Sequence, residues 1–134
     1  MELLASSGEI ALAVFNAKAG TVLEVLPGSY RIEQTLVTGN AGRADAPIVL
    51  RARTPATVHL LVDTVQAVVV SQPYWIFENL VMHVDCAEHG NCEHAFHVVD
   101  RAQSTLIRNN RLVDFNAHVN TPATKRLRRC SRGI

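Results

Sequence analysis

AVVVSQPYWIFENLVM, residues 67–82, is repeated in pattern as HVVDRAQSTLIRNNRL, residues 97–112, at a constant offset of thirty residues. The offset aligns apolar with apolar positions, namely Val68 with Val98, Val69 with Val99, Phe77 with Ile107 and Met82 with Leu112. An all-β sandwich and a β-solenoid both contain many short strands, but internal repetition favours the solenoid. A β-helix coil takes roughly 20–30 residues. The repeat therefore predicts two successive coils of a parallel β-helix, with the polar segment 83–93 as an insertion.

Short β-branched runs continue through most of the chain, which predicts a series of strands. The runs are TVLEVL, QTLVT, PIVLRA, TVHLLV, AVVVS, YWIFENLVM, AFHVV and STLIRNNRLVDF. Turn-forming pairs such as Pro27-Gly28 and Thr54-Pro55 lie between them. Asn79 and Asn109 end equivalent runs, where an asparagine tolerates a left-handed turn and can hydrogen-bond to the neighbouring coil. The fold class is therefore all-β.

The segment SGEIALAVFNAK, residues 7–18, has helical rather than alternating periodicity. Ser7 is a suitable cap, and Ile10, Val14 and Phe15 share one face. Ala19-Gly20 ends the helix. We expect it to cover the first coil, so that residues 1–20 form an N-terminal cap and residues 21–120 form the coils.

Composition and charge exclude several classes of function. The 134 residues fit one domain, and no apolar run approaches the ~20 residues of a membrane helix. The N-terminus lacks the basic region of a signal peptide. Residues 1–124 hold eight basic and twelve acidic residues. This charge balance does not indicate nucleic-acid binding, which needs a basic surface. The other five basic residues lie in the segment 121–134, which we expect to be a disordered tail or an aberrant end.

GTVLEVLPGSYRIEQTLVTGNAGRADAPIVLRARTPATVHL, residues 20–60, resembles the N-terminal part of right-handed parallel β-helix proteins of the pectin-lyase-like superfamily. It is most similar to the chondroitinase B and alginate lyase group of polysaccharide lyases. LIRNNRLVDF, residues 106–115, resembles a coil of the same superfamily. The resemblance implies a truncated, N-terminal portion of a carbohydrate-active protein that is usually secreted or periplasmic. The lyases' catalytic residues and calcium ligands lie in later coils, so no catalytic residue or cofactor is expected here, although calcium is expected in a full-length parent.

Four arginines, Arg51, Arg53, Arg108 and Arg111, are the candidate substrate-binding residues. Each pair lies in or beside a strand, and alternation directs each pair to one side, outward if the apolar neighbours face inward. Guanidinium groups bind carboxylate or sulfate groups of an acidic polysaccharide in a bidentate manner. The alternative is an ordinary solvated wall. Of Tyr74 and Trp75, only one can face outward, and Trp75 is expected in the core.

The segment DCAEHGNCEH, residues 85–94, allows three interpretations. A turn at Gly90-Asn91 would bring Cys86 and Cys92 together as a disulfide. A plain polar loop explains the segment almost as well, and a zinc site is the weakest option, because the Cys and His spacing matches no common zinc module. We expect the disulfide and no metal.

Two functions remain open from the sequence. The first is the N-terminal portion of a polysaccharide lyase that cleaves an acidic polysaccharide by β-elimination. The second is a non-catalytic β-helix module that binds carbohydrate or protein. A final coil without a cap exposes apolar side chains and strand edges, so self-association through that coil is also expected.

Overall fold

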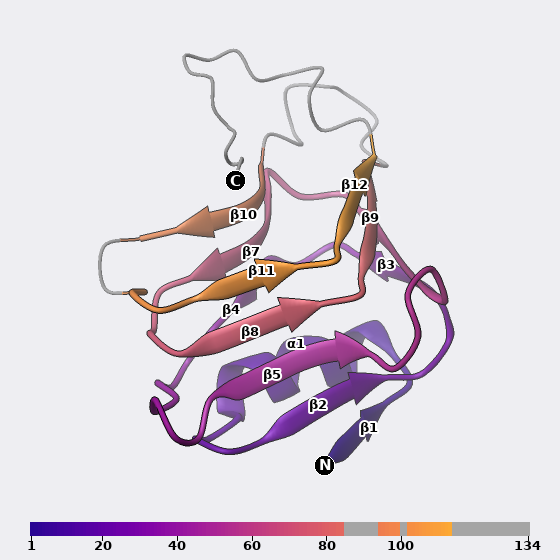
Figure 1. Cartoon of the computed structure of the whole chain (residues 1–134). Coiled ribbons are helices and arrows are strands. Elements are labelled where there is room, and N and C mark those ends of the chain that lie inside the picture. Colours follow the sequence, from indigo (N-terminus) through magenta and orange to yellow (C-terminus); the bar gives the residue numbers. More distant parts are fainter. Residues whose placement is uncertain (85–93, 100–101, 114–134) are drawn as a thin grey trace.

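The computed structural model describes residues 1–84, 94–99 and 102–113, which wind into stacked coils of short strands (Figure 1). The first coil contains β2 (Val22–Val25), β3 (Gly28–Ile32) and β4 (Leu36–Val37). The second contains β5 (Ile48–Ala52), β6 (Val58–Val62) and β7 (Gln66–Val70). The third contains β8 (Trp75–Glu78), β9 (Val81–Val84) and β10 (His94–Val98), and the fourth contains β11 (Leu106–Arg108) and β12 (Arg111–Val113).

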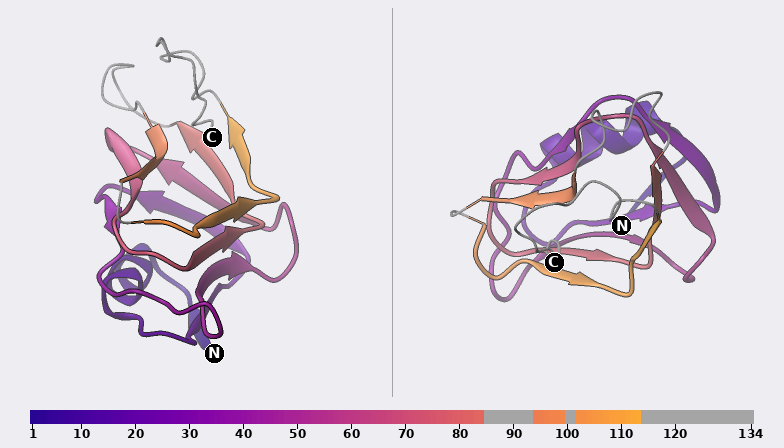
Figure 2. Two further views of the ribbon diagram at one scale, coloured as in Figure 1. Left: turned by 60° about the vertical axis from the view of Figure 1, so that its left-hand side comes forward. Right: turned by 90° about the horizontal axis from the view of Figure 1, so that it is seen from above.

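Equivalent strands of successive coils pair in parallel and form three sheets. Sheet A has the order β1-β2-β5-β8-β11, where β1 is Glu2–Leu4, sheet B has the order β3-β6-β9-β12, and sheet C has the order β4-β7-β10. Seen along the stack, the sheets surround one interior (Figure 2). This arrangement confirms the predicted fold class, a parallel β-helix with a short N-terminal helix.

The interior is filled by rows of apolar side chains that lie above one another. In sheet A, Leu23, Leu50 and Phe77 are partners in register, and all three are fully buried. β-Branched and aliphatic residues suit such rows because they pack well on a pleated, buried surface. Burial of these rows supplies the main favourable free energy of folding.

The N-terminal end of the stack is closed by strand β1 and helix α1 (Ser7–Asn16). Helix α1 contacts β2, β3 and β4 and buries Ile10 and Val14. The cap residue is Ser6, whose hydroxyl accepts from the Glu9 N–H, so the expectation for Ser7 was wrong by one position. Phe15 was also wrongly assigned to the buried face, since it is 58% exposed. Among the described residues, no helix is long and apolar enough to cross a membrane.

Two details of the strands differ from the sequence prediction. Residues 28–32 form strand β3 in sheet B, although Pro27-Gly28 indicated only a turn there. The thirty-residue offset holds for Phe77 with Ile107 and Met82 with Leu112. In sheet C, however, Val68 pairs with Phe96 and Val70 with Val98. The connections between sheets differ in length from coil to coil, so one offset cannot describe all three sheets.

Left-handed asparagines turn the chain from sheet A to sheet B, as the sequence predicted. Asn79 has φ 64° and Asn109 has φ 56°. The Nδ2 of Asn79 donates to the carbonyl of Ala52 on the preceding coil at 3.0 Å. In the fourth coil, Asn110 rather than Asn109 makes the bonds to the coil below, because its amide donates to the Phe77 carbonyl and accepts from the Leu80 N–H.

The corner at Asn79 gives a testable prediction. Asn79→Ala loses the bond to the Ala52 carbonyl. It also leaves a side chain at positive φ that has no polar group to stabilise the left-handed conformation. Asn79→Gly loses only the bond. We expect urea unfolding to show a loss of about 1 kcal/mol for the glycine variant and about 2–3 kcal/mol for the alanine variant. Equal losses for the two variants would contradict a role for the left-handed conformation.

Candidate functional site

The outward side chains of sheet A form a row of alternating charge. Glu24, Arg51, Glu78 and Arg108 are partners in register on β2, β5, β8 and β11. The Nη2 of Arg51 lies 3.4 Å from Glu24 Oε1, and the Nε of Arg108 lies 2.7 Å from Glu78 Oε1. Opposite charges directly across from each other stabilise strand pairs. We call these four residues the charged row.

Arg53, which follows β5, joins this row from the side. Its Nε lies 3.1 Å from Glu24 Oε2, so Arg51 and Arg53 share one carboxylate. The exposed fractions of the side chains are unequal, at 5% for Glu24 but 35% for Arg51 and 72% for Arg53. Glu78 and Arg108 show the same contrast, at 14% and 51%. The surface of the row therefore presents guanidinium groups, while the carboxylates that orient them lie beneath.

A second outward row on sheet A lies beside the charged row and is entirely apolar. It consists of Val22, Val49, Ile76 and Leu106, which are partners in register on the same four strands. Leu106 is 43% exposed, and the other three are half-buried. We call the two rows together with Arg53 the sheet A wall. A ligand on this wall would meet cationic groups on one side and an apolar strip on the other.

Arg111 does not share this wall. It lies on β12 in sheet B, where it is the register partner of Val81. The expectation that Arg108 and Arg111 face one side was wrong, because the corner at Asn109 and Asn110 separates them onto two sheets. Arg51, Arg53 and Arg108 therefore belong to one surface, and Arg111 belongs to another.

Trp75 lies in the core, as the sequence predicted. It is fully buried, stacks on Phe77 with ring centroids 5.6 Å apart, and donates from Nε1 to the Asn40 carbonyl. Tyr74 is half-buried and directly precedes β8, with φ 62°. Of these two rings, Tyr74 is the one that could face a sugar.

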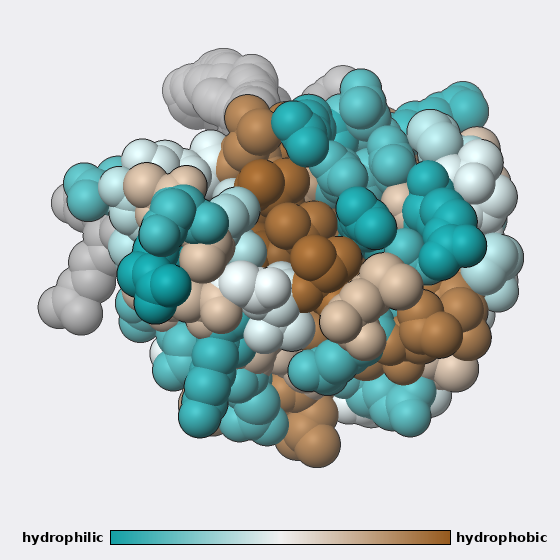
Figure 3. All heavy atoms as spheres, turned by 60° about the horizontal axis from the view of Figure 1, so that its bottom comes forward, coloured by the Kyte–Doolittle hydropathy of each residue, from teal (hydrophilic) through white to brown (hydrophobic). Residues whose placement is uncertain are grey.

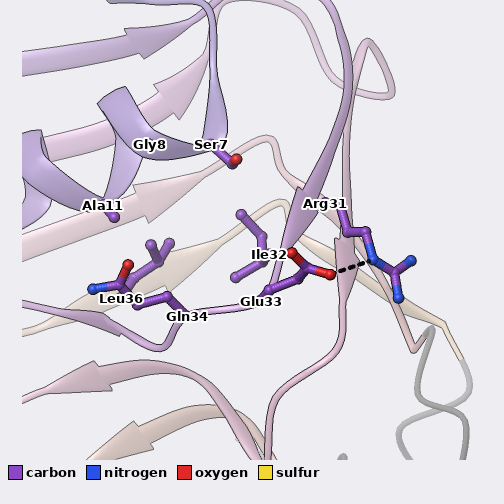
Figure 4. Close-up of a pocket in the computed structure, with 8 residues that line it drawn as sticks. All are labelled: Ser7, Gly8, Ala11, Arg31, Ile32, Glu33, Gln34 and Leu36. Carbon is purple, nitrogen blue, oxygen red and sulfur yellow. Dashed lines mark hydrogen bonds and ion pairs between the residues drawn. The ribbon is translucent and has the colours of Figure 1, made fainter.

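A small pocket lies between the start of α1 and the connection from β3 to β4 (Figure 4). Its volume is about 160 Å³. Ile32 and Leu36 are buried beside it, while Arg31 points away and bonds the Glu33 carboxylate at 3.0 Å. Because the acidic group in the pocket is Glu33, the pocket suits an acidic sugar less well than the sheet A wall does.

The N-terminal end carries exposed apolar side chains (Figure 3). They include Leu3, Leu12 and Phe15, which are more than half exposed. A shallow groove of about 310 Å³ runs between β1 and α1. At the opposite end, Val98 and Leu112 are register partners of interior residues but remain 47% and 41% exposed. Self-association through that end stays a prediction.

Residues 85–93 of the cysteine-rich segment lie outside the described residues. The disulfide between Cys86 and Cys92, the alternative metal site and the tail 121–134 therefore stay predictions. Among the residues that the structure describes, no three His, Cys, Asp or Glu side chains are close enough together to hold a metal ion.

The arginines could be predicted from the sequence, but their carboxylate partners were not predicted. Glu24 and Arg51 are 27 residues apart, and Glu78 and Arg108 are 30 apart. These separations match the coil length. The outward positions at the coil spacing, like the apolar positions, carry the signal that would predict the charged row.

No protein-family model matches the sequence, and no curated protein matches it. Solved structures of known proteins do agree with this architecture. An alginate lyase from a Paenibacillus species is similar in structure, with a TM-score of 0.60 and 21% identity over 81% of this chain and 43% of that chain. A PL6 family polysaccharide lyase from Pseudopedobacter saltans has a TM-score of 0.52 and 18% identity over 83% of this chain and 30% of that chain.

These likenesses establish the class of fold. The chain has a parallel β-helix like that of the two lyases, which confirms the resemblance seen in the sequence at the level of fold. It spans less than half the length of either protein. Because one fold carries many activities, function has to be argued from the surface.

Proposed function

We propose that this chain forms the N-terminal coils of a carbohydrate-active protein of the polysaccharide lyase type, and that the sheet A wall binds an acidic polysaccharide. The main support is the unequal exposure of the charged row. Arg53 and Arg108 are 72% and 51% exposed, while their carboxylate partners are 5% and 14% exposed. A polyanion approaching this wall meets the guanidinium groups first.

The geometry of the wall also suits a chain of acidic sugars. Neighbouring strands lie about 4.8 Å apart, so Arg51 and Arg108, two strands apart, are separated by about 10 Å along the stack. Both arginines keep N–H groups that their carboxylate partners do not use, because a guanidinium carries five N–H donors. Val49 and Ile76 beside them offer an apolar strip for the C–H face of a sugar ring.

In the parent protein the proposed reaction is β-elimination. A base removes the proton next to the carboxylate of a uronate, and a cation stabilises the negative charge that develops. We assign no catalytic residue to the described coils, so their part is to hold the polysaccharide. Calcium in a full-length parent likewise stays a prediction.

A non-catalytic binding module is the second candidate. It is favoured by the composition of the wall, whose described outward residues on β2, β5, β8 and β11 include no lysine, histidine or tyrosine to act as a base. Both candidates require the wall to bind polysaccharide. They differ in whether an unsaturated uronate product forms, which a spectrophotometric assay on alginate detects.

Binding can be tested by affinity electrophoresis and calorimetry with alginate. Arg53→Gln and Arg108→Gln should each weaken binding by about 2- to 5-fold, and the double variant by about tenfold, as expected for exposed charge pairs. The wild-type affinity should fall with added salt. Arg43→Gln is the matched control, because Arg43 is 68% exposed and pairs with Asp45 in a separate turn.

Dextran, a neutral polysaccharide, is the control ligand in this binding test. The proposal predicts no retardation in dextran gels. Equal binding to dextran and alginate, or unchanged alginate affinity in the Arg53→Gln, Arg108→Gln double variant, would exclude the sheet A wall as the binding surface.

A further inference from the structure

Two histidines of neighbouring coils meet on the outer face of sheet B. His59 lies on β6 and His83 on β9. Their rings stack with centroids 5.2 Å apart and an angle of 30° between the planes. The Nδ1 of His59 lies 3.0 Å from the Nε2 of His83. Neither residue belongs to the sheet A wall, and the sequence alone does not indicate the pair.

The contact brings one ring nitrogen of each histidine within hydrogen-bond distance of the other. Between two neutral rings, one nitrogen donates its N–H and the other accepts with its lone pair. Two imidazole nitrogens this close together can also become ligands of one metal ion after a small rotation of the rings. Zinc–nitrogen bonds of ~2.0–2.1 Å in a tetrahedral site place two ligand nitrogens about 3.4 Å apart. The observed 3.0 Å is only a few tenths of an ångström shorter.

The parallel sheet holds the two rings in place. His59 is the register partner of Val81, and Leu61 is the register partner of His83. The histidines therefore occupy one diagonal of a four-residue block, and Leu61 and Val81 occupy the other. Val81 is only 6% exposed, and both histidines are half-buried. The fold therefore already holds both histidine side chains in place, and a metal that binds them has to immobilise little more.

The strand register of sheet B shows which charged residues lie next to the two histidines. Arg31 is the partner of Leu61, and ion pairs with Glu33 and Asp63 neutralise it. Arg111, the partner of Val81 on the next coil, remains as a cation beside the block. It weakens the binding of a divalent ion, but it favours an anionic ligand such as a carboxylate at an open position of a bound metal.

We propose that His59 and His83 form a binding site for a divalent transition metal of the zinc type, with Nδ1 of His59 and Nε2 of His83 as ligands. Imidazole nitrogen suits zinc, copper and nickel rather than calcium. Water or an anion fills the remaining positions. In the neutral pair, the bridging hydrogen moves to the far nitrogen of its own ring when the metal binds, so no net proton is released. The site does not depend on polysaccharide binding.

Zinc titration of the full chain tests the proposal, with selective ¹⁵N labelling of the histidines. One zinc ion should shift the ring-nitrogen resonances of His59 and His83 together, with the changes at His59 Nδ1 and His83 Nε2. His59→Gln and His83→Gln should each weaken zinc binding in calorimetry by at least about 10- to 100-fold, since loss of a supporting residue alone costs that much. His97→Gln, on sheet C, should leave the affinity unchanged.

The controls separate this site from other ligands in the chain. Circular dichroism of each variant must show a wild-type fold, and His59→Asn serves if the glutamine variant fails to fold. Zinc that shifts only other histidines, or whose affinity survives both substitutions, would overturn the proposal. Absence of binding at millimolar zinc would also overturn it. Alginate binding by the His59→Gln variant should be normal, which keeps the two proposals distinguishable.

Discussion

Phe77→Ala should destabilise the protein by about 3–5 kcal/mol, close to the whole stability of a marginal domain. Phe77 is fully buried in the middle of the stack and contacts Trp75 and Phe96 through its ring. Removing the ring leaves a cavity between coils, and the paired strands limit how far the coils can collapse to fill it. Urea unfolding followed by circular dichroism measures the loss.

The matched control is Phe15→Ala. The same side chain is removed, but Phe15 is 58% exposed, so the change should stay within about 0.5 kcal/mol. If Phe77→Ala does not fold, Phe77→Leu should fold with a smaller loss than the alanine variant, because leucine keeps an apolar side chain in the core and leaves a smaller cavity. Similar losses for Phe77→Ala and Phe15→Ala would contradict the assignment of the core.

Glu24→Gln should also destabilise the protein clearly, with a loss of about 1–3 kcal/mol. The Glu24 side chain is 5% exposed and pairs with both Arg51 and Arg53. Glutamine keeps the shape but removes the charge, so two guanidinium groups remain close together without their counterion. The loss should stay below the ~3–5 kcal/mol of a broken, fully buried pair, since water can solvate both arginines.

Glu33→Gln is the control for this prediction. Glu33 also pairs with an arginine, Arg31, but it is 68% exposed, and the expected change is within about 0.5 kcal/mol. A double-mutant cycle of Glu24→Gln with Arg53→Gln isolates the pair, and we expect a coupling of at least about 0.5 kcal/mol. Additive losses would indicate that Glu24 stabilises the protein through burial alone.

Much of the fold could be predicted from the sequence because stacking repeats the same environment in every coil. Phe77 and Ile107, or Asn79 and Asn109, occupy equivalent places, so similar residue types recur at the coil spacing. The shift in sheet C could not be predicted this way, because its register depends on connections of unequal length. The N-cap residue of helix α1 was predicted one position too late, because serine is an equally good N-cap at position 6 and at position 7.

The candidate sites depended more strongly on the tertiary structure. The sequence by itself determined the parallel β-helix, the buried Trp75 and the outward direction of Arg51 and Arg53, since alternation and repetition are local properties of the chain. Only the folded coils decided that Glu24 and Glu78 lie beneath the arginines, that Arg111 faces elsewhere, and that His59 meets His83. These contacts join residues more than twenty positions apart, and their register is set by packing of the whole stack rather than by neighbours in sequence.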